Sequence, residues 1–261
     1  MAILDVTQRG AVAELVMNAP ERLNALSDEM LAALHSTLDE LAATPSVRVI
    51  TLAGAGKAFC AGHDLRQMTA MRQAKDGGTA ALKDLFDRCA AVMARIQSMP
   101  QPVIAQVHGI ATAAGCQLVA TCDMAVAAEG TRFGVNGVNI GLFCSTPMVA
   151  LSRNIPRKQA FEMLTTGEFI EAARAAELGL INRAVPLAEL AAETQSLADQ
   201  ISAKLGAAVK FGKQAFYEQL QMPTAQAYAF TGDVMVENMA HPDTKEGIDA
   251  FLEKRDPRWT Q

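Results

Sequence analysis

The feature that most constrains the fold is an alternation, through the first half of the chain, of β-branched runs with Ala- and Leu-rich helical stretches. Strands are predicted at residues 12–17, 47–53, 103–107 and 124–127. Helices are predicted at residues 28–42, behind a capping Ser27, and at 79–97 and 115–121. Strand–helix alternation of this kind predicts a largely parallel sheet with helical crossovers, and so an α/β fold.

Strand patterns nearly vanish from residue 147 onward. Helices are predicted there at residues 157–165, 171–178, 187–205, 207–220, 224–239 and 244–254. We therefore expect an α/β core followed by an all-helical last third.

Composition excludes several classes of protein. The 261 residues are 50% hydrophobic, which suits one large domain or a domain with a small appendage. The net charge is −5 and the 23 Lys and Arg are scattered, so we expect no nucleic-acid partner. No apolar run reaches the roughly 20 residues that a membrane span needs, and residues 1–10 do not resemble a secretory signal. These features predict a cytoplasmic protein.

The five cysteines (Cys60, Cys89, Cys116, Cys122 and Cys144) are odd in number and irregularly spaced. This pattern argues against a disulfide framework and gives no paired metal ligands. We expect reduced thiols within the core. Cys144 is the one cysteine for which a reactive role remains an alternative.

Two loops of small residues each follow a predicted strand and precede a predicted helix. The first is GAGKAFCAGHDL at residues 54–65, and the second is GIATAAGCQ at residues 109–117. Gly62 permits a backbone that leaves the His63 N–H free, and free N–H groups of the second loop begin a helix. Either loop alone is an ordinary strand-to-helix turn. Two that converge on one oxygen can stabilise a thioester enolate or oxyanion.

Read together, KAFCAGHDL and VHGIATAAGCQLVATCD resemble the two signature segments of the crotonase superfamily, which includes enoyl-CoA hydratases and isomerases. The resemblance runs nearly end to end and includes ERLNAL at 21–26, FGVNGVNIGL at 133–142, TTGEFIEAARAAELGLINRAVP at 165–186 and EGIDAFLEKRDPRW at 246–259. No GxGxxG or GKS/T string follows a strand, which excludes a Rossmann or P-loop nucleotide site.

The resemblance implies a crotonase (ClpP/crotonase-like) fold, with a spiral core of ββα repeats and a helical C-terminal trimerisation region. We accordingly expect a core with the acyl-CoA site at residues 1–190 and an oligomerisation region at residues 191–261. The expected partners are an acyl-CoA thioester and further copies of the chain, as a homotrimer or hexamer. No metal or tightly bound cofactor is expected, because coenzyme A arrives as part of the substrate.

Roles carry over from the family position by position. The backbone N–H groups of His63 and Ala114 would form the oxyanion hole. The positions implied to bind coenzyme A are Arg22, Asn24, Leu26, Ala61, His63, Asp64, Leu65 and Lys254.

The chain departs from the family at its catalytic carboxylates. Hydratases of the family use two glutamates, and Gln117 and Gly137 stand at those positions. A catalytic Asp of other members aligns with Ser145. An amide cannot accept a proton and glycine has no side chain, so hydratase activity is doubtful, although restoring both glutamates is expected to restore it. AAGCQL and NIGLFCSTP resemble one subgroup, the enoyl-CoA hydratase domain-containing protein 3 type.

Three functions therefore remain open: an acyl-CoA-binding protein of the hydratase/isomerase type, a non-catalytic or regulatory binder of CoA thioesters, and an atypical acyl-CoA hydrolase or isomerase. The last would use His63, Cys144 or Ser145. Each has a plainer interpretation. The His63 ring would line the coenzyme A channel, while Ser145 and Thr146 would cap a helix that begins at Pro147. Asp64 is expected to cap the helix after His63.

Overall fold

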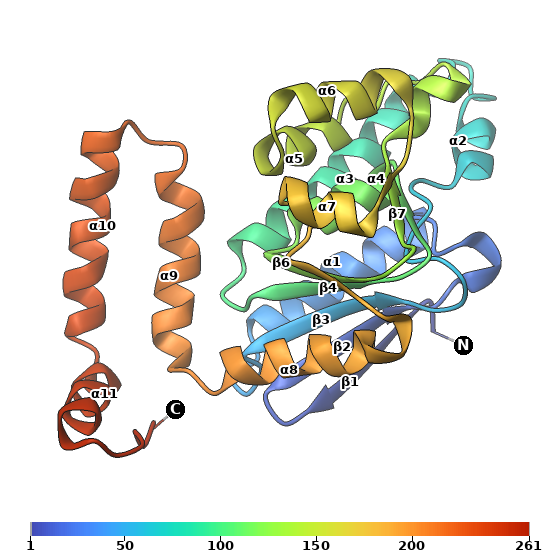
Figure 1. Ribbon diagram of the computed structural model, residues 1–261. Helices are drawn as coiled ribbons and strands as arrows, with labels where there is room; N and C mark the ends of the chain where they lie inside the picture. The colour runs from blue at the N-terminus through green and yellow to red at the C-terminus, as the bar shows by residue number, and fades with distance from the viewer. Residues whose placement is uncertain (1, 261) are drawn as a thin grey trace.

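The strands of the chain form two sheets in the computed structural model, which describes residues 2–260 (Figure 1). The larger sheet has the order β1 (Leu4–Arg9), β2 (Val12–Met17), β3 (Val49–Gly54), β4 (Val103–Val107), β6 (Met124–Ala128) and β9 (Arg183–Val185). β1 pairs with β2 antiparallel, and every other pairing in this sheet is parallel. The prediction of a largely parallel sheet is confirmed.

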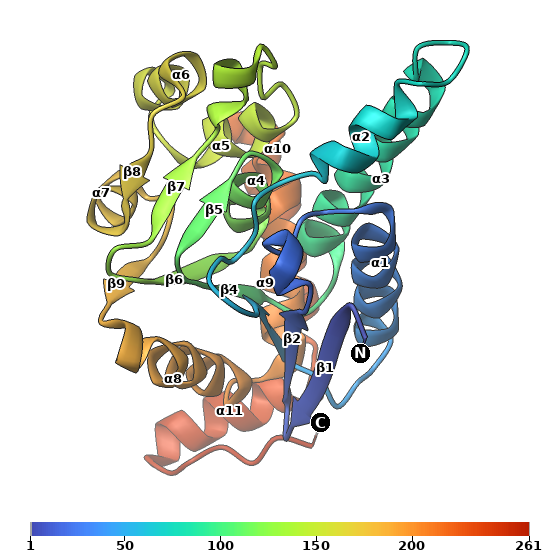
Figure 2. The same cartoon turned by 90° about the vertical axis from the view of Figure 1, so that its right-hand side faces the viewer.

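The smaller sheet has the order β5 (Ile110–Thr112), β7 (Arg132–Gly134) and β8 (Ile170–Glu171). β5 directly follows β4, and β7 directly follows β6, so each strand pair is divided between the two sheets. The two sheets meet along the loops between them, as Figure 2 shows. This division produces the expected spiral of ββα repeats.

Helices cover the sheets and enclose the core. They are α1 (Asp28–Ala42), α2 (Leu65–Met71), α3 (Thr79–Ser98), α4 (Ala114–Thr121), α5 (Pro147–Asn154), α6 (Arg157–Thr166), α7 (Ala172–Leu178) and α8 (Leu190–Ser202), with 3-10 turns η1 (Pro20–Arg22), η2 (Asn136–Ile140) and η3 (Leu187–Glu189). As predicted, α1 begins after Ser27, whose Oγ accepts a hydrogen bond from the Met30 N–H at 3.2 Å. No helix of the described residues is long and apolar enough to cross a bilayer.

The last helices, α9 (Gly206–Gln219), α10 (Thr224–Met239) and α11 (Pro242–Glu253), project from the core (Figure 1). The buried ammonium of Lys213 fastens α9 to the core, donating to the carbonyls of Ile96 at 2.6 Å and Gln101 at 2.8 Å and to Asp123 Oδ2 at 2.7 Å. α8 follows the expected domain boundary at residue 190. It nevertheless packs on the larger sheet, where Ala198 lies in one cluster with Val49. The projecting part of the chain thus begins at α9.

Some predicted elements differ from the structure. Strands are nearly absent after residue 147, as predicted. The last third is nevertheless not all-helical, because it contains β9, which, like β8, completes a sheet. β9 is only three residues long and β8 two, too short to show a periodic pattern. The predicted helix at 187–205 is divided into η3 and α8. A helix start at Pro147 was predicted, but not the end of α5 at Asn154.

Candidate functional site

The first small-residue loop links β3 to α2 and is held by backbone hydrogen bonds on two sides. The Leu26 N–H donates to the Gly62 carbonyl at 2.8 Å, and the Cys60 N–H donates to the Ile110 carbonyl at 3.2 Å. Gly62 has φ +90°, a conformation that L residues rarely adopt. Asp64 caps α2 as expected, accepting from the Arg66 N–H at 2.9 Å.

The second loop links β5 to α4 through Ala113, which has φ 49° and ψ −119°. A non-glycine residue in such a sparsely populated region costs on the order of 1–3 kcal/mol and persists only where its surroundings hold it. The Ala113 N–H donates to the Gly134 carbonyl at 2.9 Å, which fixes this conformation. The chain enters α4 at Ala114, whose N–H is one of the first helical amides without an intrahelical acceptor.

The two loops converge. A Cβ on Gly62 would lie 3.2 Å from the Ala114 nitrogen and 3.0 Å from the Thr112 carbonyl oxygen. The Thr112 N–H donates to the Cys60 carbonyl at 3.0 Å, so the loops are directly bonded. Within the described chain, no acceptor is paired with the His63 or Ala114 N–H. Two unpaired amide donors therefore stand on adjacent loops.

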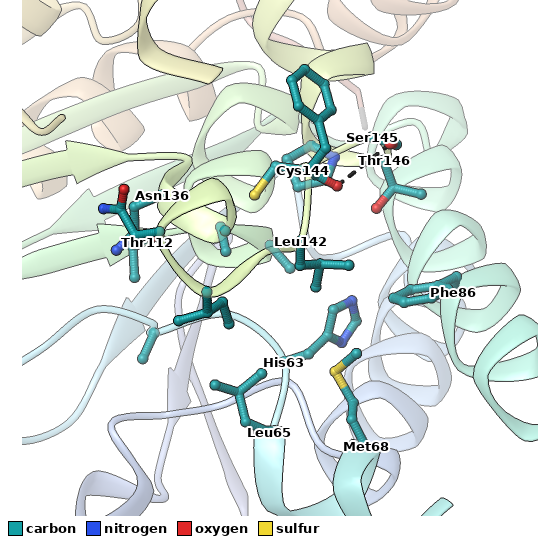
Figure 3. Close-up of a pocket in the computed structure, with 18 residues that line it drawn as sticks. His63, Leu65, Met68, Phe86, Thr112, Asn136, Leu142, Cys144, Ser145 and Thr146 are labelled. Atoms are coloured by element: carbon teal, nitrogen blue, oxygen red, sulfur yellow. Dashed lines mark hydrogen bonds between the residues drawn. The ribbon is translucent and has the colours of Figure 1, made fainter. Parts of the chain in front are cut away.

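These loops form part of the wall of a cavity of about 390 Å³ (Figure 3). The rest of the wall comes from α2 and α3, through Met68 and Phe86, and from the segment 136–147. The lining side chains are mostly apolar, and none of the described residues in the wall is Asp or Glu. A pocket of this size and character suits an acyl chain.

The His63 imidazole lies in this wall. Its Nδ1 is 3.3 Å from the Leu26 carbonyl oxygen, and its ring packs edge-to-face on Phe86 with the centroids 5.5 Å apart. Nε2 is buried without a hydrogen-bond partner among the described residues. Burial lowers the pKa of His63 below its ordinary value, so the ring is neutral near pH 7.

Gln117 and Gly137, where the family has glutamates, have different surroundings. Gln117 lies in α4, is 6% exposed, and its Oε1 has no partner in the described chain. A Cβ on Gly137 would lie 2.3 Å from the Leu142 carbonyl oxygen and 2.9 Å from Cys144 Sγ. The segment 142–144 therefore fills the position from which a side chain would extend. The expectation that glutamates at both positions restore hydratase activity requires a space that this backbone does not have.

Cys144, Ser145 and Thr146 line the cavity but lack the partners of a nucleophile. Burial raises the pKa of the Cys144 thiol above its ordinary value, although the Gly137 N–H donates to its sulfur. Ser145 Oγ donates to the Phe143 carbonyl at 3.4 Å. Thr146 is the N-cap of α5, but its side chain makes no capping hydrogen bond, so the capping prediction is right in position and wrong in mechanism. All five cysteines are free and buried.

The residues expected to bind coenzyme A are only partly brought together. Ala61 and Leu65 line the cavity. Arg22 and Asp64 do not line it, and they pair with each other at 3.5 Å. Asn24 is fully buried, and its Nδ2 donates to the carbonyls of Ala55 and Ala58, both at 2.8 Å. Its side chain shapes the first loop instead of facing a ligand. Leu26 is also buried, and its backbone bonds to the first loop at Gly62 and lies against the His63 ring.

Lys254 lies apart from the other expected residues. It is the C-cap of α11, which Figures 1 and 2 place far from α2 and the cavity wall. Within one copy of the chain, Lys254 is therefore not part of this site.

The His63 ring is surrounded by the side chains of Phe86, Met68 and Leu142, none of which was predicted from the sequence (Figure 3). They come from elements distant in the sequence, and their apolar character is common to core positions. No group of described residues has the three or more His, Cys, Asp or Glu ligands that a metal ion needs.

Comparison with known proteins assigns the family. The enoyl-CoA hydratase/isomerase family matches residues 7–261. A Xenopus laevis protein named enoyl-CoA hydratase domain-containing protein 3, mitochondrial, is 44% identical over 97% of this chain and 84% of its own length. The crystal structure of an enoyl-CoA hydratase from Mycobacterium smegmatis has a TM-score of 0.95 at 51% identity, covering 99% of both chains. The human enoyl-CoA hydratase domain-containing protein 3 has a TM-score of 0.94 at 43% identity, covering 98% of this chain and 100% of that one.

These relatives also correct one expectation. The predicted cytoplasmic location is wrong by this comparison, because the similar Xenopus, mouse and human proteins are named as mitochondrial. The predicted fold and subgroup are confirmed. The chain belongs to the enoyl-CoA hydratase/isomerase family and has the crotonase fold.

Proposed function

We propose that this protein binds acyl-CoA thioesters and holds the thioester carbonyl oxygen between the N–H groups of His63 and Ala114. The observation that carries the proposal is the pair of unpaired amides on converging loops at the wall of an apolar cavity. An oxygen that gains negative charge there would accept two hydrogen bonds and face the N-terminus of α4. Each donor is worth about 3 kcal/mol where charge develops in a transition state.

Ordinary hydratase chemistry has little support from the side chains. The two carboxylate positions hold Gln117 and Gly137, and the wall has no carboxylate among its described residues. A general acid or base typically contributes about 10²- to 10⁴-fold, so hydration of an enoyl-CoA would be slow. We therefore favour an acyl-CoA-binding protein with weak or atypical catalysis, and keep a non-catalytic or regulatory CoA-thioester binder as the second candidate.

A hydrolase or isomerase that uses Cys144 or Ser145 is less well supported. The raised pKa of Cys144 keeps it a thiol, and a thiol is a weak nucleophile. Ser145 Oγ bonds to a carbonyl, and no base is hydrogen-bonded to it among the described residues.

We further propose that the chain assembles as a homotrimer or hexamer through its last helices. Large apolar side chains on α10 and α11 are exposed, including Tyr228 at 76%, Val236 at 70% and Phe251 at 82%. Exposed apolar patches of this kind mark protein–protein contacts. If Lys254 meets a coenzyme A phosphate, it does so at the site of another copy.

Calorimetry with coenzyme A, butyryl-CoA and crotonyl-CoA tests the binding proposal, and a steady-state assay with crotonyl-CoA tests the chemistry. We expect binding that is tighter for the thioesters than for free coenzyme A, with slow or absent hydration. Absence of any binding would overturn the proposed pocket. Hydration at rates typical of enzymes would overturn the argument from the missing carboxylates.

A further inference from the structure

The orientation of the His63 ring assigns its proton. Nδ1 is 3.3 Å from the Leu26 carbonyl oxygen, which can only accept a hydrogen bond. The backbone holds this contact in place, since Leu26 and His63 also form a β-bridge. Phe86 packs against the ring edge-to-face and limits its rotation. In the neutral ring, Nδ1 therefore carries the hydrogen and Nε2 carries a lone pair.

No donor in the described chain forms a hydrogen bond to Nε2. Figure 3 shows the ring among Leu142, Phe86 and Met68, and these side chains offer no donor. Buried acceptors in native proteins are almost always paired, so an unpaired one beside a ligand cavity points to a partner supplied from outside the chain.

Several other polar side chains of the wall already make hydrogen bonds within the chain. Thr112 Oγ1 donates to Asn136 Oδ1 at 2.5 Å, Asn139 Nδ2 donates to the Gly167 carbonyl at 3.3 Å, and Ser145 Oγ donates to Phe143. Of the buried side-chain atoms without a partner among the described residues, only His63 Nε2 belongs to a residue of the cavity wall. Among the described residues, it is therefore the buried acceptor of the wall that a hydrogen-bond donor on a ligand would satisfy.

We propose that His63 is a specificity-determining residue whose Nε2 accepts a hydrogen bond from a hydroxyl on the acyl chain. The cavity then favours hydroxyacyl thioesters over hydrocarbon acyl thioesters of the same length. The inference rests on the proposed acyl-CoA function, and it assigns the ring a task separate from that of the His63 backbone N–H. Access to Nε2 requires a small shift of its neighbours, and Leu142, which is 45% exposed, has room to move.

Calorimetry on the native protein at pH 7.5 tests the preference directly. Butyryl-CoA, 3-hydroxybutyryl-CoA and 4-hydroxybutyryl-CoA share the same coenzyme and chain length and differ in the presence and position of the hydroxyl. We expect one of the hydroxylated ligands to bind about tenfold more tightly than butyryl-CoA, the size of one net hydrogen bond.

His63→Phe removes the acceptor, keeps an aromatic ring against Phe86 and leaves the backbone N–H in place. In this variant the ratio of the dissociation constant for butyryl-CoA to that for the preferred hydroxylated ligand should fall to about one. His63→Gln offers an amide oxygen and should retain part of the preference. His108→Phe is the matched control, because His108 is a partly buried imidazole bonded to Gly56 and does not line the cavity, so the ratio should equal that of the native protein.

The outcomes separate this inference from the proposed function. Equal affinity of the native protein for all three ligands would overturn the role of His63 while leaving acyl-CoA binding intact. Persistence of the preference in folded His63→Phe, or its loss in His108→Phe, would also overturn it. Failure of the native protein to bind any CoA thioester would overturn the proposed function, and this inference with it.

Discussion

The Cβ of any side chain at position 137 would lie 2.3 Å from the carbonyl oxygen of Leu142. The Leu142 N–H donates to the Gly137 carbonyl at 2.9 Å, so the turn closes tightly on the glycine. The turn therefore leaves no room for a side chain at position 137. A carboxylate at this position would need the whole turn to move.

Restoring the glutamates should therefore fail. We expect Gly137→Glu, alone or with Gln117→Glu, to lower the free energy of unfolding by about 1–3 kcal/mol or more through overpacking, and to gain no hydratase activity. Urea denaturation and a crotonyl-CoA assay measure the two effects. Gly137→Ala isolates the contact, with Gly212→Ala as its control, because a Cβ on Gly212 meets nothing within 4 Å. Efficient hydration by the double variant would contradict this reading of the turn.

Replacement of Gly62 should weaken acyl-CoA binding more than replacement of a glycine with a similar backbone conformation elsewhere in the chain. Gly62→Ala and Gly130→Ala both place a side chain at positive φ, +90° and +78° respectively. Only at Gly62 would the new Cβ press on the second loop, at 3.0 Å from Ala113 Cβ. We expect Gly62→Ala to weaken acyl-CoA binding about tenfold or more by separating the two donors, and Gly130→Ala to leave the dissociation constant unchanged. Equal dissociation constants for the two variants would count against the convergence of the loops.

Burial of His63 should make stability depend on pH in the acid range. Its pKa is lowered in the folded protein by burial, with opposing contributions from the Leu26 carbonyl and the Asp28 carboxylate, which itself pairs with Arg88. Between its folded pKa and about 6.5, the unfolded chain binds the proton and the folded protein does not. Stability is therefore highest above about pH 6.5 and is lost as the pH falls below it, by at most about 1.4 kcal/mol per pH unit for one proton.

Urea denaturation of the native protein and of His63→Phe at pH 8 and at pH 5 measures this contribution. The native protein should lose more stability than the variant over that range, since only the native protein has this imidazole. The same loss in both proteins would show that other groups cause the pH dependence.

Lys213 should be essential to the attachment of the last helices. Replacing it with Met leaves the Asp123 carboxylate, also bonded to the Tyr217 hydroxyl at 2.9 Å, without its buried cation. Loss of one partner of a buried pair typically costs about 3–5 kcal/mol. Lys210→Met, one turn earlier on α9 and exposed, is the control and should change the free energy of unfolding by less than about 0.5 kcal/mol. A similar small change in Lys213→Met, measured by urea denaturation, would contradict the anchoring role.

The elements that sequence predicted well are those with a complete local signal. The strand at residues 103–107 and the helix at 28–42 have the predicted bounds, because the first is a buried β-branched run and the second has a cap and a regular apolar face. β1 was missed because five of its six residues are exposed, which hides the alternation. β5 and β7 have three residues each and exist through pairing with distant strands.

The residues of the site likewise divide into those with a local sequence signal and those without one. The two loops are contiguous strings, so His63 and Ala114 could be singled out from sequence alone. Phe86 and Leu142 reach the cavity through tertiary packing, which no local pattern encodes. The closure of the turn at Gly137 was equally hidden, since the sequence shows which side chain is missing and not what occupies its place.

The conformation of Ala113 has a consequence for how a ligand would meet this protein. The unfavourable backbone angles are held by a hydrogen bond within the protein itself, from the Ala113 N–H to the Gly134 carbonyl. In the proposed oxyanion hole, the free energy needed to orient the Ala114 amide is thus supplied when the chain folds. An arriving thioester would find that donor already oriented and would lose little affinity to reorganisation of the protein. With Gly at position 113 the backbone would be less restricted, so part of the ordering would occur only on binding and would lower the affinity.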